Sequence, residues 1–171
     1  MLYADILNLP IKRCEMKVKL TRIIEELKDT LEGEPWFGQS VYALIQGVNP
    51  EYSLKKPADN CHSLVELIYH MVTWADFTLK RIQKEPIKDM ATFEKTDWRT
   101  IDKVNHSWEE GVSLFIDTNN RLLSALDKLD DKFLSEKVDY REYDFAYLLN
   151  GLIQHNIYHA GQVAYVKKLL E

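Results

Sequence analysis

The segment Phe145–Leu170 (FAYLLNGLIQHNIYHAGQVAYVKKLL) decides the fold class, because its apolar side chains recur every three or four residues. That spacing predicts one long α-helix with an apolar stripe along a single face. The stripe consists of Leu148, Leu152, His155, His159, Val163, Val166 and Leu170. Two histidines therefore occupy positions that are expected to face the interior of the protein.

Three further segments repeat the same helical spacing. Their approximate bounds are Ile11–Leu31, Ser63–Lys84 and Asp102–Leu129. Gly33 and Pro35 are expected to stop the first of these helices, and Pro86 the second. Ser63 and Glu66 fit a capping box, in which each side chain accepts from the backbone N–H of the other residue.

These segments predict an all-α protein, a four-helix bundle of antiparallel type. A short extra helix is expected after helix 1, at about Val41–Gly47, where Ser40 can provide the cap. The connection from Pro86 to Thr100 covers about 15 residues, which is long for a bundle and typical of a functional loop. We expect residues 1–171 to form a single domain.

The composition excludes several classes of protein. The chain has 171 residues, 46% of them hydrophobic and 29% charged, with a formal net charge of −5. An acidic domain is a poor binder of phosphate backbones, so no nucleic-acid partner is expected. No apolar run reaches the length of a membrane span, and residues 1–12 do not resemble a signal peptide. A cytoplasmic location is therefore expected, with Cys14 and Cys61 as free thiols.

The pair His155 and His159 is the strongest candidate for chemistry. A spacing of four residues places both imidazoles on one helix face, one turn apart, where they can bind one metal ion. Two hydrogen-bonded core histidines are the alternative, and the spacing alone does not separate the two interpretations. A metalloprotease of the His-Glu-x-x-His type is disfavoured, because Asn156 stands where the catalytic glutamate would be.

A third ligand is available in His70, which also lies on an apolar helix face. Three protein ligands would leave a coordination position for water or substrate, as in catalytic zinc sites. His62 and His106 are expected to lie outside the site. Trp98 is the best candidate for the edge of an aromatic pocket.

Three residues near the expected ligands are candidates for supporting roles. Glu66 lies one turn before His70, but its part in the capping box is the preferred role. Gln162 could hydrogen-bond a ligand or simply pack, and Gly161 is expected to allow a close helix approach.

The sequence resembles the DinB-like superfamily, which includes the bacterial thiol-dependent S-transferases, over nearly its whole length. The matching stretches are Trp36–Ser40, Leu64–Trp74, Asp97-Trp98 followed by Trp108, and Gly151–Val163. The last is the most specific, because it matches the family pattern of His, three residues, His, one residue and Gly-Gln in full. Members are four-helix bundles, and the resemblance implies a divalent metal held by His70, His155 and His159.

The resemblance also implies an activity and partners. Characterised members join a small thiol such as bacillithiol or mycothiol to an electrophile, or isomerise a substrate with the thiol as cofactor. A homodimer is a further implication. Three histidines do not distinguish Zn, Ni, Fe and Mn.

The sequence leaves three functions open. They are a metal-dependent S-transferase that uses a small thiol, a metal-dependent hydrolase of a small substrate, and a non-enzymatic stress-response or interaction module. Whether the protein is an enzyme stays open at this stage, and no catalytic or cofactor-binding residue is assigned.

Overall fold

The computed structural model describes residues 17–86 and 89–171, which form six α-helices. The helices are α2 (Val18–Glu32), α3 (Val41–Gln46), α4 (Leu64–Ile82), α5 (Met90–Asp97), α6 (Trp108–Leu126) and α7 (Phe145–Leu170). Two short 3₁₀ helices lie at Pro50–Tyr52 and Asp131–Ser135. The described residues contain no β-strand, only an isolated bridge between Lys137 and Asp144.

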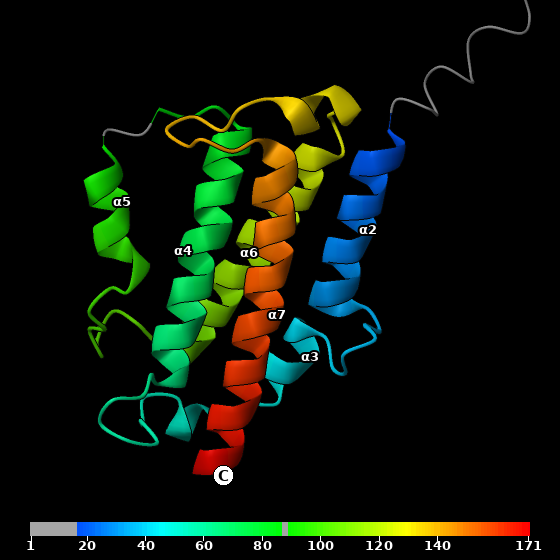
Figure 1. The fold of residues 1–171 in the computed structure, drawn as a ribbon. Helices are drawn as coiled ribbons and strands as arrows, with labels where there is room; N and C mark the ends of the chain where they lie inside the picture. Colours follow the sequence, from blue (N-terminus) through cyan, green and yellow to red (C-terminus); the bar gives the residue numbers. More distant parts are fainter. Residues whose placement is uncertain (1–16, 87–88) are drawn as a thin grey trace, which may run out of the picture.

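The four long helices α2, α4, α6 and α7 form a bundle, and the short α3 packs against the lower part of α2 and α7 (Figure 1). This confirms the predicted all-α four-helix bundle with a short extra helix after the first long one. None of the helices in the described part of the chain has both the length and the apolar character needed to cross a membrane.

The prediction of a loop between Pro86 and Thr100 is wrong, because this connection contains the helix α5. Asp89 caps this helix by accepting a hydrogen bond from the backbone N–H of Thr92 at 2.6 Å. Phe93 attaches the helix to α4, with its ring 4.6 Å from that of Phe77. None of the α5 residues is fully buried, so the segment lacks the strong apolar periodicity that reveals a helix in a sequence.

The path through α5 sets the direction of the next helix. As Figure 1 shows, α5 returns the chain along the outside of α4, and α6 then starts at the same end of the bundle as α4. The pair α4 and α6 is therefore parallel, which departs from the antiparallel arrangement expected for the bundle. Helices α4 and α7 run antiparallel to each other. The side chains of the candidate site come from this pair of helices.

The helix ends agree with the sequence to different degrees. Helix α7 has the predicted bounds, and α4 begins with the predicted capping box of Ser63 and Glu66. Helix α6 begins at Trp108 rather than Asp102, because Ser107 is its cap and Asp102 closes a separate turn by accepting from the Val104 N–H.

Two other expected helix starts have different outcomes. Ser40 holds the N-cap position of α3 without a side-chain capping bond. The predicted start of the first helix at Ile11, and Cys14 with it, lie outside the described residues.

Glycine positions show where helices approach each other closely. A Cβ added to Gly111 on α6 would lie 2.7 Å from Cγ2 of Ile68 and 3.0 Å from Cε2 of Tyr69. Any larger residue at this position would therefore require the side chains of Ile68 and Tyr69 on α4 to shift. The expectation for Gly161 is wrong: it is exposed, and an added Cβ would meet no atom within 4 Å.

Candidate metal centre

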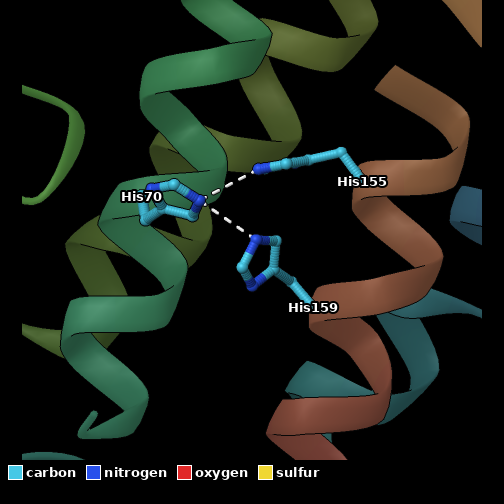
Figure 2. A group of neighbouring side chains, drawn as sticks. All are labelled: His70, His155 and His159. Atoms are coloured by element: carbon cyan, nitrogen blue, oxygen red, sulfur yellow. Dashed lines mark hydrogen bonds between the residues drawn. The ribbon is translucent and has the colours of Figure 1, made fainter. Parts of the chain in front are cut away.

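Three histidines from two facing helices converge in the structure. His70 projects from α4, and His155 and His159 project toward it from α7 (Figure 2). The Nε2 atom of His70 lies 3.0 Å from Nε2 of His155 and 3.0 Å from Nε2 of His159. These residues form the one group of three or more histidine, cysteine, aspartate or glutamate side chains in the described residues that could hold a metal ion.

The three histidine residues differ in their solvent exposure. His70 is 5% exposed and His159 is 4% exposed, whereas His155 is only partly buried. The apolar stripe on α7 explains this arrangement, since it turns positions 155 and 159 toward α4. His155 is therefore the one ring of the three that belongs to a partly exposed residue, although its Nδ1 atom is buried.

Oxygen acceptors fix the orientation of two of the rings. Nδ1 of His70 lies 2.9 Å from Oδ1 of Asp97 and 3.1 Å from its backbone carbonyl oxygen. Nδ1 of His159 lies 2.6 Å from Oε1 of Gln162. These oxygens only accept, so each Nδ1 carries the hydrogen and donates it, and each Nε2 presents a lone pair. Metal-binding histidines are commonly held in this way.

The Nε2 atoms of His70 and His159 carry no hydrogen, and their close approach is what a shared metal cation would require. With both hydrogens on Nδ1, no hydrogen is available between two lone pairs that are 3.0 Å apart. Nitrogen ligands lie ~2.0–2.1 Å from zinc, which places two tetrahedral ligands about 3.3 Å apart. Small ring movements would therefore accommodate an ion, and the three residues fit a divalent metal. Nδ1 of His155 is buried without a hydrogen-bond partner among the described residues.

Trp98 covers the outer face of the His70 ring. The two rings are stacked with centroids 3.9 Å apart and planes at 9°. His62 stacks on Trp98 from the other side, again at 3.9 Å. His62 is thus near the site but separated from it by the indole ring.

The other histidine and the supporting residues are also placed by the structure. His106 lies at the start of α6, where its Nδ1 accepts from the Asp102 N–H at 2.9 Å. Glu66 completes the capping box and pairs with Lys56 at 2.8 Å, so it does not support His70. Gln162 hydrogen-bonds His159. Asp97 is the supporting residue that the sequence does not reveal, since the dipeptide Asp97-Trp98 indicates only the family resemblance and not the contact with His70.

Burial keeps the three rings neutral. Burial, with a smaller effect from His159 and His70, lowers the pKa of His155 from 6.5 to about 3. Burial and then His70 lower the pKa of His159 to about 4, although the Gln162 hydrogen bond opposes the change. Burial also lowers the pKa of His70, despite the carboxylate of Asp97. At neutral pH the Asp97–His70 contact is therefore a hydrogen bond from a neutral ring, and neutral imidazole is the form that binds metals.

These pKa values predict a loss of stability in acid for the metal-free protein. The folded pKa lies below the unfolded value of 6.5, so between about pH 6.5 and pH 4 the unfolded chain binds more protons than the folded one. The free energy of unfolding should fall by about 1–2 kcal/mol per histidine from pH 7 to pH 5. Urea denaturation at both pH values, with chelator present, measures this change.

A double variant, His155→Ala with His159→Ala, is the control for that measurement, because it retains the other titrating groups. Its decrease between pH 7 and pH 5 should be smaller than that of the natural protein. An equal decrease in both proteins would contradict the assignment of neutral buried histidines.

Comparison with known proteins identifies the family. Residues 37–163 match the family model described as the DinB superfamily. The chain belongs to the DinB superfamily. This match includes all three histidines of the DinB site, together with Asp97 and Gln162.

A solved structure shares the fold of this chain. The crystal structure of "the conserved protein of locus from Enterococcus faecalis" is similar, with a TM-score of 0.50 and 19% sequence identity. The similarity covers 91% of this chain and 98% of that chain, and at this identity it shows the fold alone. No curated protein matches the sequence significantly.

Proposed function

We propose that this DinB-superfamily protein binds one divalent metal ion through His70, His155 and His159 and acts as a thiol-dependent S-transferase. The observation that supports the metal site is the convergence of three ring nitrogens, one from each histidine, within 4.8 Å of one another. The family membership supports the choice of a transferase over other metal-dependent reactions. Zn, Ni, Fe and Mn all suit an imidazole site, and the small thiol is of the bacillithiol or mycothiol type.

The protein residues have distinct roles in this proposal. Asp97 and Gln162 hold His70 and His159 with their Nε2 atoms toward the common centre. Trp98 shields the His70 ring from water. The partly exposed His155 marks the side from which thiol and electrophile would enter. When bound, the metal would lower the pKa of a thiol and so provide a thiolate nucleophile near neutral pH.

The overall reaction balances without an oxidant or reductant. The thiol gives up its proton, its sulfur forms a bond to an electrophilic carbon, and the leaving group departs with the bonding electrons. A site with three histidine ligands would leave a bound metal one exchangeable coordination position, which suits this chemistry.

The assay that tests the transferase proposal varies metal and thiol independently. The protein is incubated with a chlorodinitrobenzene-type haloaromatic in four samples, which contain metal and bacillithiol, metal alone, bacillithiol alone, or neither. We expect conjugate to form faster than in the uncatalysed reaction only when metal and thiol are both present, and no acceleration with His159→Ala. His62→Ala is the matched control and should retain activity, because its ring lies behind Trp98.

Two outcomes would overturn the proposal when the assay is extended to an ester or amide substrate and to the thiols mycothiol and glutathione. Hydrolysis of an ester or amide by the metal-loaded protein without thiol, and no conjugate with thiol, would identify a hydrolase. Absence of turnover in every arm with metal fully bound, across the small thiols bacillithiol, mycothiol and glutathione, would favour a non-enzymatic module.

A further inference from the structure

A small cavity opens between α4 and α7 beside the histidine group. Its volume is about 190 Å³, and His155 forms part of its wall. The other lining residues are Trp74, Thr78, Tyr143, Tyr147, Leu148, Gly151 and Leu152. His155 is the one member of the triad that lines the cavity, so the cavity adjoins the candidate metal site along the His155 ring.

The cavity walls offer an apolar surface. Two of the polar groups near it are already committed to other partners: the indole N–H of Trp74 donates to Asp97 at 2.7 Å, and the hydroxyl of Thr78 donates to the carbonyl of Trp74 at 2.9 Å. The aromatic rings of Tyr143 and Tyr147, 5.0 Å apart, flank the cavity from the N-terminal end of α7. An apolar group can therefore fill the space without leaving these two donors unpaired.

We propose that this cavity holds a single aromatic ring, or an aliphatic group of the same size, in the substrate whose reactive atom lies at the histidine group. An apolar cavity of ~150 Å³ accommodates benzene, so about 190 Å³ suits one ring with a small substituent. This inference rests on the proposed function, because it assigns the substrate class of the same site. The substrate is thus an electrophile with a compact apolar group adjacent to its reactive carbon.

Gly151 provides a specific way to fill the cavity. It lies in α7 one turn before His155, and an added Cβ would meet no atom within 4 Å. A leucine at this position has free space for its first carbon and extends from a residue that lines the cavity. Gly161 is a matched control, because it is also a helical glycine in α7 with no atom within 4 Å of an added Cβ, and it does not line the cavity.

Neither substitution should impair folding. Replacing a glycine within a helix by leucine favours the helix by up to ~1 kcal/mol, and the benefit applies to both positions. A difference between Gly151→Leu and Gly161→Leu then reports on the cavity and not on the stability of α7. Circular dichroism and the metal content of both variants should equal those of the natural protein.

The experiment is a titration with toluene, followed through the indole N–H signal of Trp74 in NMR spectra. We expect toluene to shift this signal in the natural protein and in Gly161→Leu with the same dissociation constant. Gly151→Leu should bind at least tenfold more weakly. Equal affinity in Gly151→Leu, or no binding to any of the three proteins, would overturn the proposal.

Metal-free and metal-loaded samples of each protein are titrated in parallel. The cavity walls include a single residue of the histidine group, so toluene should bind in both states. If the protein binds no metal, the proposed function fails while the toluene result still reports on the cavity. If metal binds and toluene does not, the cavity inference fails alone.

Discussion

Replacing His159 by alanine is expected to remove most of the bound metal. The variant keeps only two of three imidazole ligands, and it also leaves Gln162 without its partner on the ring. The loss of an outer hydrogen-bond partner alone weakens metal affinity by ~10–100-fold, so the loss of a ligand should exceed about 100-fold. Elemental analysis after dialysis and competition with a chromogenic chelator measure the effect. His155→Ala should behave in the same way.

His62→Ala and His106→Ala are the controls for this result. His62 is separated from the site by Trp98, and His106 accepts a backbone hydrogen bond at the start of α6. Both variants should keep one equivalent of metal. A full equivalent in His159→Ala would contradict the assignment of the ligands.

Replacing Asp97 by asparagine should weaken metal binding by about tenfold without removing a ligand. The carboxylate accepts from Nδ1 of His70 and from the indole of Trp74, so its charge makes the His70 ring a better donor to a cation. The effect should lie at the lower end of the 10–100-fold range, because the backbone carbonyl of Asp97 still accepts from His70 in the variant. Chelator competition measures the change in affinity.

Asp117→Asn removes an equal charge at a distance and serves as the control. The Asp117 side chain is 63% exposed and pairs with Arg121 on α6. The Asp117→Asn variant should bind the metal with the same affinity as the natural protein. An Asp97→Asn variant with unchanged affinity would show that the carboxylate supports the local structure only.

The parts of the fold that the sequence predicts are those encoded by local patterns. Helix α7 has a continuous apolar stripe and was predicted to its ends, and the Ser63–Glu66 capping box defines the start of α4. The same stripe predicted that His155 and His159 face inward. His70 was predicted as the third ligand from an apolar helix face, and the structure brings its ring to the other two.

The features that the sequence did not reveal depend on contacts between distant segments. Helix α5 is held to α4 by Phe93 and has no buried residue, so it lacks a periodic signal. Its path brings Asp97 to His70, 27 positions away in the chain. Gly111 could not be distinguished from Gly161 by sequence, because only the packing of α6 on α4 shows which glycine is needed.

Anomalous diffraction from crystals of metal-loaded protein, prepared without an affinity tag, tests the central claim most directly. The account predicts one strong peak between α4 and α7, for zinc ~2.0–2.1 Å from the Nε2 atoms of His70, His155 and His159. A peak bound to other residues, or no peak at this position in fully loaded crystals, would contradict it.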